Sequence, residues 1–218
     1  VDHVELVKLV DKSLCHLPAP QADIKRLPGP NRLTKSSFVE YQRPINQAHV
    51  CLGTVAYSVK HKDRYPLMVM NALLGEGMSS RLYQNIREKY GFAYTVYSFV
   101  NMLSDTGEFG AYIGTDKKNI DNSIDLIRKE LDKLKTKMVS RAELERTKSQ
   151  IKGVMMLGLE NMSGRMTRLG SGELYFNTYT SLDSVLKKVD AVTPESINRV
   201  ANDLFREPRF STVVIRPA

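Results

Sequence analysis

Apolar residues recur along this chain with two different periods, and these periods divide it into helical and extended segments. A spacing of three and four residues predicts an amphipathic helix, whereas runs of β-branched and aromatic residues between turn signals predict a strand. The pattern predicts helices at residues 4–14, 63–74, 80–90, 120–138, 140–159, 182–189 and from 193 onward, and strands at 37–42, 47–59, 94–102, 108–115 and 210–215. Strands at both ends with helices grouped between them indicate an α+β fold, in which one mainly antiparallel sheet is covered on one face by helices.

Local signals support several of these boundaries. The turn sequence Ser104-Asp105-Thr106-Gly107 separates two predicted strands and favours a hairpin. Ser140 followed three residues later by Glu143 is a capping-box signal that opens a helix. Thr193 before Pro194 indicates another helix start, since threonine caps well and proline is favoured at the first helical position.

Prolines cut the first helix off from the rest of the chain. Four prolines and Gly29 fall between positions 18 and 30, a composition typical of an extended, semi-rigid linker. We therefore expect residues 1–17 to be the terminal helix of a preceding domain, residues 18–35 to be a linker, and residues 36–218 to be the α+β domain.

The composition, 42% hydrophobic and 26% charged, is that of a globular protein, but the formal net charge of +8 raises the question of nucleic acid. Basic residues alternate with acids in stretches such as 128–133, which is typical of a solvated helix face. The aromatic stretch 90–99 contains no basic residue, so it lacks the pattern of a base-stacking groove. We expect no nucleic-acid partner, while acidic surfaces or peptides remain compatible with the charge. No apolar run is long enough to predict a membrane span.

The residue pattern predicts no metal site in this chain. Neither HExxH nor its inversion HxxEH occurs among the four histidines. The close pairs Cys15–His16 and His49–Cys51 each lack the matching second pair that a zinc site requires. We expect the histidines to be structural or solvent-exposed, and the two cysteines to be isolated buried thiols. A nucleophile elbow of the GxSxG type is also missing from the sequence.

The stretch from Leu73 to Ser98 has the most specific local pattern. A predicted helix ends near Arg87 and meets Gly91, a candidate for the left-handed residue after a helix, and a strand follows at Tyr94. The side chains of Arg87 and Tyr94 can then point into one space, where a guanidinium and a phenol suit a peptide carbonyl or a developing oxyanion. The alternative is that Arg87 only complements the helix dipole and Tyr94 only packs. Spacing alone leaves both interpretations open.

Several motifs, in the same order, resemble the second half of pitrilysin-type zinc peptidases, the group that includes insulin-degrading enzyme, the mitochondrial processing peptidases and two-copy bacterial relatives. The sharpest match is Arg87-Glu88-Lys89-Tyr90-Gly91-Phe92-Ala93-Tyr94. The other stretches that carry the resemblance are Gln47–Val50, Asp63–Leu67, Leu74–Leu82, Ser104–Gly107 and Glu173–Tyr175, with a looser match at Val1–Val7.

The resemblance implies a clamshell of two similar α+β halves that closes around a peptide substrate. One half holds zinc through HxxEH and a distant Glu, and the other supplies an Arg and a Tyr that bind substrate. This chain is then the substrate-binding half of a zinc metalloendopeptidase, with Arg87 and Tyr94 in those roles. Zinc belongs to a catalytic partner half, either upstream in the same chain or on a separate subunit, and this chain alone is expected to bind none and to be inactive.

Two further expectations follow from the resemblance. The turn containing Gly75 and Gly77 resembles a loop associated with substrate handling and could border the chamber, although a plain helix–helix turn explains these glycines as well. An alternative function is that of a catalytically inactive scaffold, because some relatives persist as structural subunits of respiratory complexes. The compartment stays open: cytoplasm or periplasm in a bacterium, or the mitochondrial matrix in a eukaryote.

Overall fold

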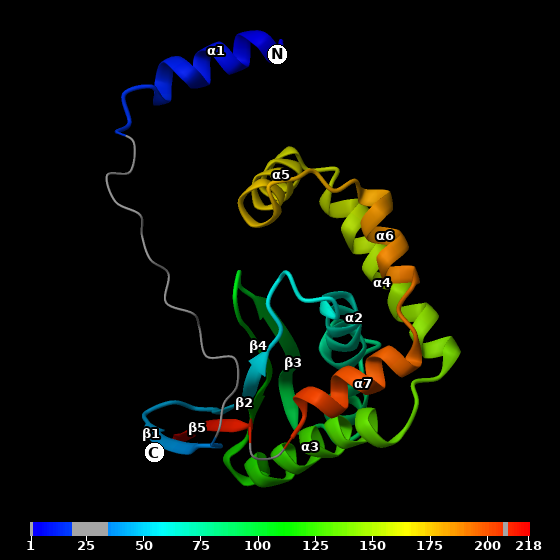
Figure 1. Ribbon diagram of the computed structural model, residues 1–218. Coiled ribbons are helices and arrows are strands. Elements are labelled where there is room, and N and C mark those ends of the chain that lie inside the picture. Colours follow the sequence, from blue (N-terminus) through cyan, green and yellow to red (C-terminus); the bar gives the residue numbers. More distant parts are fainter. Residues whose placement is uncertain (1, 19–34, 207–208) are drawn as a thin grey trace.

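The computed structural model describes residues 2–18, 35–206 and 209–218 of the chain (Figure 1). The predicted linker at 18–35 therefore lies almost entirely outside the described residues. The predicted domain boundaries around it remain predictions.

Five strands form one sheet in the order β1-β5-β2-β4-β3. The strands are β1 (Phe38–Arg43), β2 (Ala48–Ala56), β3 (Ala93–Met102), β4 (Gly107–Thr115) and β5 (Ser211–Pro217). Only the β1–β5 pair is parallel, and the other three neighbouring pairs are antiparallel. The predicted hairpin is confirmed, because β3 and β4 pair along their whole length, from Ala93 opposite Thr115 to Met102 opposite Gly107.

Helices connect and cover these strands. They are α1 (His3–Leu14), α2 (Arg64–Gly75), α3 (Ile120–Thr136), α4 (Arg141–Gly158), α5 (Met162–Phe176), α6 (Leu182–Asp190) and α7 (Pro194–Leu204), with a π-helical turn η1 (Tyr83–Glu88) and a short 3-10 turn η2 (Lys117–Asn119). The predicted start of α7 is confirmed by a reciprocal capping box between Thr193 and Ser196. Ser140 likewise caps α4 through the amide of Glu143.

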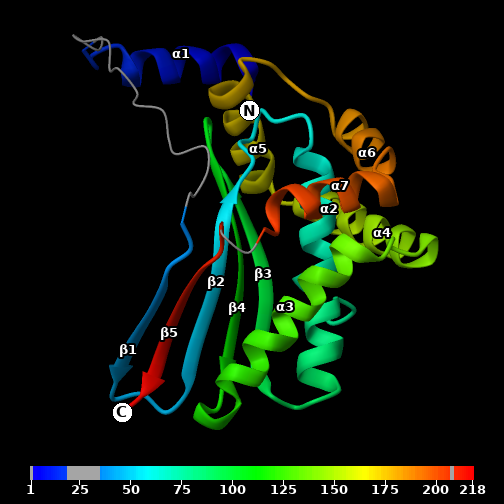
Figure 2. The same ribbon diagram turned by 60° about the horizontal axis from the view of Figure 1, so that its bottom comes forward.

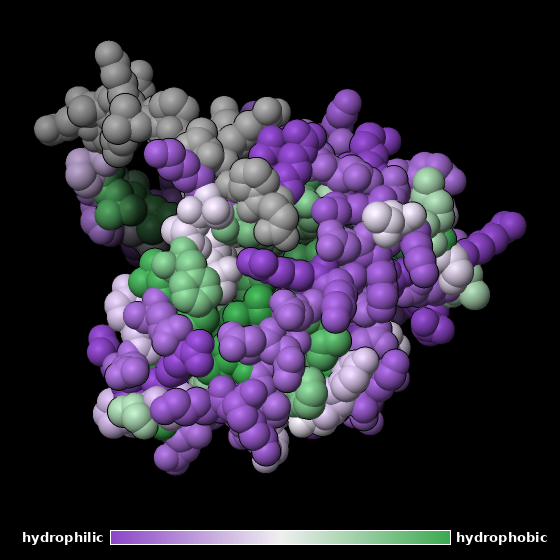
Figure 3. All heavy atoms as spheres, turned by 90° about the horizontal axis from the view of Figure 1, so that it is seen from below, coloured by the Kyte–Doolittle hydropathy of each residue, from purple (hydrophilic) through white to green (hydrophobic). Residues whose placement is uncertain are grey.

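The helices cover one face of the sheet, as predicted. Along β2 every second residue is fully buried, from Ala48 to Ala56, and the residues between them are half-buried. Figure 2 shows α2, α3 and α7 together on one side of the strands. Seen from below in Figure 3, the surface is mostly hydrophilic, with a hydrophobic patch left of centre. The apolar core lies between the sheet and this first helical layer.

Three features differ from the sequence-based expectations. Helix α5 was not predicted, and it buries none of its residues. The predicted regular helix at 80–90 contains the π-helical turn η1, in which the amide of Lys89 bonds to the carbonyl of Gln84, five residues back. The expectation of two buried thiols is wrong for Cys15, which is exposed just after α1, while Cys51 is half-buried on the sheet.

Helix α1 packs extensively against no other helix or strand in the described part of the chain. It has no buried residue, and the apolar side chains of Val4, Val7, Val10 and Leu14 are each about half exposed. Figure 1 shows it apart from the sheet and the other helices. An apolar helix face left in water is unfavourable, since burial of such side chains is a main source of helix stability in proteins.

A close backbone contact sets the position of α2 on the sheet. A Cβ atom added to Gly75, the last residue of α2, would lie 2.1 Å from the backbone nitrogen of Ser98 in β3. The Ser98 hydroxyl donates to the carbonyl of Asn71, one turn earlier in α2, at 3.1 Å. The sequence places glycine at Gly75 because any side chain would push the end of α2 away from β3.

This contact predicts a large effect of Gly75→Ala on stability. The added methyl collides with the backbone of β3, so the free energy of unfolding should fall by about 1–3 kcal/mol, the usual range for overpacking. Gly153→Ala is the matched control, because Gly153 is also helical and nothing lies within 4 Å of its added Cβ. Denaturant unfolding should show a gain of about 0.5–1 kcal/mol for the control. Equal values for the two variants would contradict the proposed contact.

Candidate functional site

The junction between η1 and β3 carries the two predicted substrate-binding residues. Gly91 has φ +64°, in the left-handed region that glycine adopts without strain, and it reverses the chain between them. Its amide bonds back to the carbonyl of Arg87 at 3.0 Å, and the amide of Phe92 bonds to that of Ile86 at 3.3 Å. The predicted role of Gly91 as the residue that ends the helix is confirmed.

Arg87 and Tyr94 both project into solvent at this end of the sheet. The Arg87 guanidinium lies over the ring of Tyr83, 4.9 Å from its centroid, and forms no hydrogen bond or ion pair with a described residue. Tyr94 is 74% exposed, and its hydroxyl likewise has no partner among the described residues. The two side chains therefore come from adjacent elements with their donors available for a ligand. No hydrogen bond or cation–π contact joins Arg87 to Tyr94.

An irregularity in the sheet accompanies the exposure of Tyr94. Ala93 pairs with Thr115 and Thr95 pairs with Gly114, so Tyr94 is the extra residue of a bulge at the start of β3. The hydroxyl of Thr115 donates to the carbonyl of Phe92 and fixes the chain just before the bulge. Bulges of this kind re-aim a side chain at the edge of a sheet.

Polar contacts from two helices hold η1 and the residues just before it in place. Arg81 forms two hydrogen bonds with Glu143 of α4, at 2.8 and 2.9 Å. Asn85 donates to the buried carboxylate of Glu130 in α3 at 3.1 Å, and Lys133 donates to the same oxygen at 2.6 Å. Helix α4 therefore holds the residues just before η1, and α3 holds η1 itself. The position of the Arg87 backbone follows from the packing of these two helices.

The glycine turn after α2 packs against α4. Gly77 has φ +79°, and its added Cβ would lie 2.9 Å from the side-chain nitrogen of Gln150. That nitrogen donates to the carbonyl of Glu76 at 3.1 Å. Gly75 and Gly77 thus have clear structural roles. Their contact with a substrate chamber stays a prediction.

An aromatic cluster on the uncovered face of the sheet was not identified from the sequence. Tyr112 Oη and His49 Nδ1 share a hydrogen bond of 2.6 Å, and the rings of Tyr97 and Tyr112 lie 5.1 Å apart. Burial raises the pKa of the Tyr112 phenol, and the neighbouring Tyr97 and Cys51 raise it further. These residues lie on three strands, so only the sheet register brings them together.

The described residues contain no group of three or more His, Cys, Asp or Glu side chains that could hold a metal ion. His49 binds Tyr112, and His61 stacks on Tyr57 with ring centroids 3.9 Å apart. Neither arrangement offers convergent ligands. In the same part of the chain, no helix is long and apolar enough to cross a membrane.

The fold is that of a peptidase M16 domain. Residues 1–151 match the family model described as the peptidase M16 inactive domain. The chain belongs to the peptidase M16 family. It is 37% identical over 177 residues to the uncharacterized zinc protease YmxG of Bacillus subtilis, covering 81% of this chain and 43% of that protein. An uncharacterized zinc protease of Streptomyces coelicolor is 37% identical over 172 residues, covering 78% and 38%.

Solved structures agree with this placement. A protease from Helicobacter pylori superposes with a TM-score of 0.88 at 25% identity, covering all of this chain and 53% of that one. The peptidase M16 inactive domain from Pseudomonas fluorescens has the same fold, with a TM-score of 0.88 at 19% identity, covering 100% and 52%. The chain thus spans about half the length, or less, of these relatives. The resemblance drawn from the Arg87–Tyr94 motif and the predicted α+β fold are confirmed.

The contact between Arg81 and Glu143 predicts a loss of stability when Arg81 is replaced. In Arg81→Met, the half-buried Glu143 carboxylate loses its partner, and the free energy of unfolding should fall by about 1–3 kcal/mol. Adding Glu143→Gln removes the unpaired charge, so the double variant should lose clearly less than the sum of the two single variants. A double-mutant cycle measured by denaturant unfolding tests this. Strict additivity would show that the pair contributes nothing.

Proposed function

We propose that this chain is the substrate-binding half of a zinc metalloendopeptidase that hydrolyses peptides in a closed chamber. The observation that carries the proposal is the pair of unpartnered donors, Arg87 and Tyr94, at the η1–β3 junction of a peptidase M16 inactive domain. Apart from the contact of Arg87 with the Tyr83 ring, neither group has a hydrogen-bond or ion-pair partner among the described residues. Both are strong donors for a peptide carbonyl.

A catalytic half that carries HxxEH completes the proposal, whether it is upstream in the same chain or a separate subunit. The chain spans only about half the length of its relatives, which leaves room for such a half. In this proposal the metal and the water that it activates belong to that partner, and the described residues contain no group of side chains that suits zinc. This chain on its own should be inactive.

The role of this chain in hydrolysis is then to bind and orient the peptide. Tyr94 donates a hydrogen bond to a backbone carbonyl near the scissile bond, and Arg87 adds a second donor and a positive charge. Donors fixed in advance stabilise the negative charge that develops on the carbonyl oxygen during attack. The bulge at Tyr94 and the packing of η1 support this role, because they fix the backbone positions from which the two side chains extend.

Helix α1 is proposed to be the terminal helix of the preceding domain, joined to this one by a linker at residues 18–35. Its exposed apolar face supports this, because no described residue covers Val4, Val7, Val10 and Leu14. The alternative function, a catalytically inactive scaffold, shares this fold and differs in predicting that Arg87 and Tyr94 are dispensable.

Substitution of the two donors tests the function. In the full-length protein, Tyr94→Phe and Arg87→Ala should each lower peptide turnover about 100- to 1000-fold, the usual effect of removing one donor to a developing oxyanion. Zinc content, measured by elemental analysis, should be unchanged, because neither residue lies in a metal site. Turnover is read with a quenched fluorescent peptide.

Matched controls separate this role from a general loss of surface groups. Tyr41→Phe removes the hydroxyl of another exposed tyrosine, on β1, and Arg146→Ala removes an exposed arginine of α4. Both controls should retain full turnover. If Tyr94→Phe and Arg87→Ala also retain it, the assignment is wrong and the scaffold alternative gains support.

A further inference from the structure

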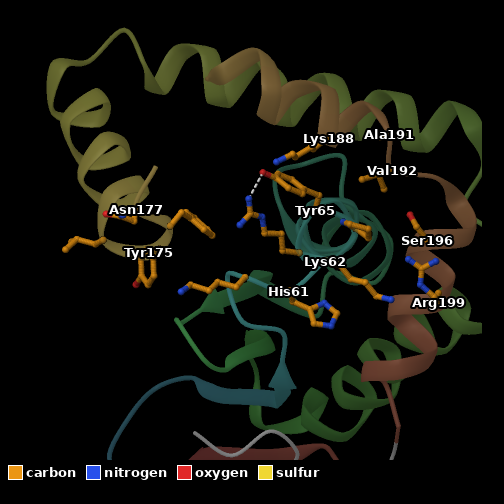
Figure 4. Close-up of a pocket in the computed structure, with 15 residues that line it drawn as sticks. His61, Lys62, Tyr65, Tyr175, Asn177, Lys188, Ala191, Val192, Ser196 and Arg199 are labelled. Atoms are coloured by element: carbon orange, nitrogen blue, oxygen red, sulfur yellow. Dashed lines mark hydrogen bonds between the residues drawn. The ribbon is translucent and has the colours of Figure 1, made fainter. Parts of the chain in front are cut away.

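A cavity of about 970 Å³ lies between the start of α2, the end of α5 and the junction of α6 with α7 (Figure 4). Its lining is rich in cations and contains no Asp or Glu. The basic residues that line it are Lys60, His61, Lys62, Arg64, Lys188 and Arg199. They come from segments more than 100 positions apart, so no local sequence pattern reveals them.

Aromatic rings form one wall of the cavity around Arg64. Its guanidinium lies 4.7 Å from the centroid of the Tyr65 ring and 4.6 Å from that of Phe176. It donates to the carbonyl of Val59 at 2.6 Å and to the Tyr65 hydroxyl at 2.9 Å. Lys188 also lies over the Tyr65 ring, at 5.6 Å. Arg64 is therefore a fixed part of the wall, and all its partners are neutral.

The other cations of the cavity differ in how they are compensated. Arg199 forms an ion pair with Asp63 at 2.6 Å. Lys60, Lys62 and Lys188 are exposed and form no ion pair with a described residue. Four lysines elsewhere in the described part of the chain do form ion pairs: Lys133, Lys135, Lys148 and Lys152. Positive charge is left uncompensated at this cavity.

Like charges gathered around one cavity repel each other, and an anionic ligand relieves that repulsion. The nature of the donors narrows the choice of anion. Arginine is the side chain suited to bidentate phosphate binding. Here the Arg64 guanidinium already donates to Val59 and Tyr65, and Arg199 is paired with Asp63. Separate lysine ammonium groups beside the apolar surfaces of Leu174 and Phe176 suit carboxylates spaced along a chain that has apolar parts.

We propose that this cavity binds an acidic segment of a peptide, with its carboxylates near Lys60, Lys62 and Lys188 and its apolar parts against Tyr65 and Phe176. This inference rests on the proposed function, since it makes the cavity a second contact for the same peptide substrates. It adds a preference in substrate choice: peptides with a run of Asp or Glu bind more tightly than neutral ones.

The cavity lies at the other end of the sheet from Arg87 and Tyr94. The amide of Val59, just before Lys60, bonds to the carbonyl of Leu103 at the hairpin end of β3, whereas Tyr94 is at the start of that strand. Ten residues of β-strand span roughly 30 Å. The acidic segment would therefore lie at least about ten residues of extended chain from the segment gripped by Tyr94.

Peptide binding to charge-deleted variants tests the proposal. A fluorescein-labelled peptide with a glutamate run, and the same peptide with glutamines, are titrated with the full-length protein and followed by fluorescence anisotropy. In the double variant Lys60→Gln with Lys62→Gln, affinity for the glutamate peptide should fall about tenfold, consistent with two exposed charge contacts of modest strength. Affinity for the glutamine peptide should be unchanged.

A control with the same loss of charge is Lys129→Gln with Lys137→Gln, at exposed positions in and just after α3 that do not line the cavity. It should bind the glutamate peptide as the unmodified protein does. Equal affinity of the two double variants for that peptide would overturn the proposal. Tripolyphosphate is titrated in a parallel arm; binding that depends on Lys60 and Lys62, without glutamate-peptide binding, would also overturn the assignment to a peptide.

Failure of this proposal is distinguishable from failure of the proposed function. If the cavity does not select acidic peptides, turnover of a neutral peptide should still depend on Arg87 and Tyr94. If turnover of the neutral peptide is independent of those two residues, the proposed function itself fails.

Discussion

The close approach of α2 to β3 is the constraint on which the rest of the domain depends. Only glycine at Gly75 lets the end of the helix lie against Ser98, and the Ser98 hydroxyl fixes the preceding turn through Asn71. The chain then leaves α2 through the Gly77 turn, which Gln150 of α4 holds by a hydrogen bond to Glu76. The turn η1 follows, so the location of Arg87 beside the start of β3 follows from this packing. A helix displaced from β3 would carry the candidate site with it.

The same packing places different chemical groups at the two ends of the sheet. At one end, the η1–β3 junction presents a guanidinium and a phenol that form no hydrogen bond or ion pair within the described part of the chain. At the hairpin end, α2 begins beside a cavity that is lined by cations and aromatic rings. Salt-dependent attraction can act over roughly 10 Å at ordinary ionic strength, whereas a hydrogen bond to a carbonyl acts only in contact. The first end suits precise orientation of a peptide backbone, and the second suits selection of acidic side chains.

Local chemistry explains why the fold, and the placement of Arg87 and Tyr94 on either side of Gly91, were predictable. Alternation in β2, the turn before Gly107 and the caps at Ser140 and Thr193 are each specified by neighbouring residues, and the η1–β3 junction is specified by Gly91. Helix α5 escaped prediction because it contains three glycines and buries no residue, which leaves neither strong propensity nor a buried stripe. The period of apolar residues also fails to separate an α-helix from the π-helical η1. The cationic cavity could not be predicted from the sequence, because Lys60 and Lys188 are brought to one cavity only by the packing of α6 beside α2.

The most direct test of the central claim is a structure of the full-length protein with a peptide bound, its hydrolysis blocked by substitution of the catalytic base in the other half. The account predicts that a backbone carbonyl of the peptide lies within hydrogen-bond distance of Tyr94 Oη, with the Arg87 guanidinium beside the same segment. A peptide held in the chamber with neither side chain in contact would contradict it.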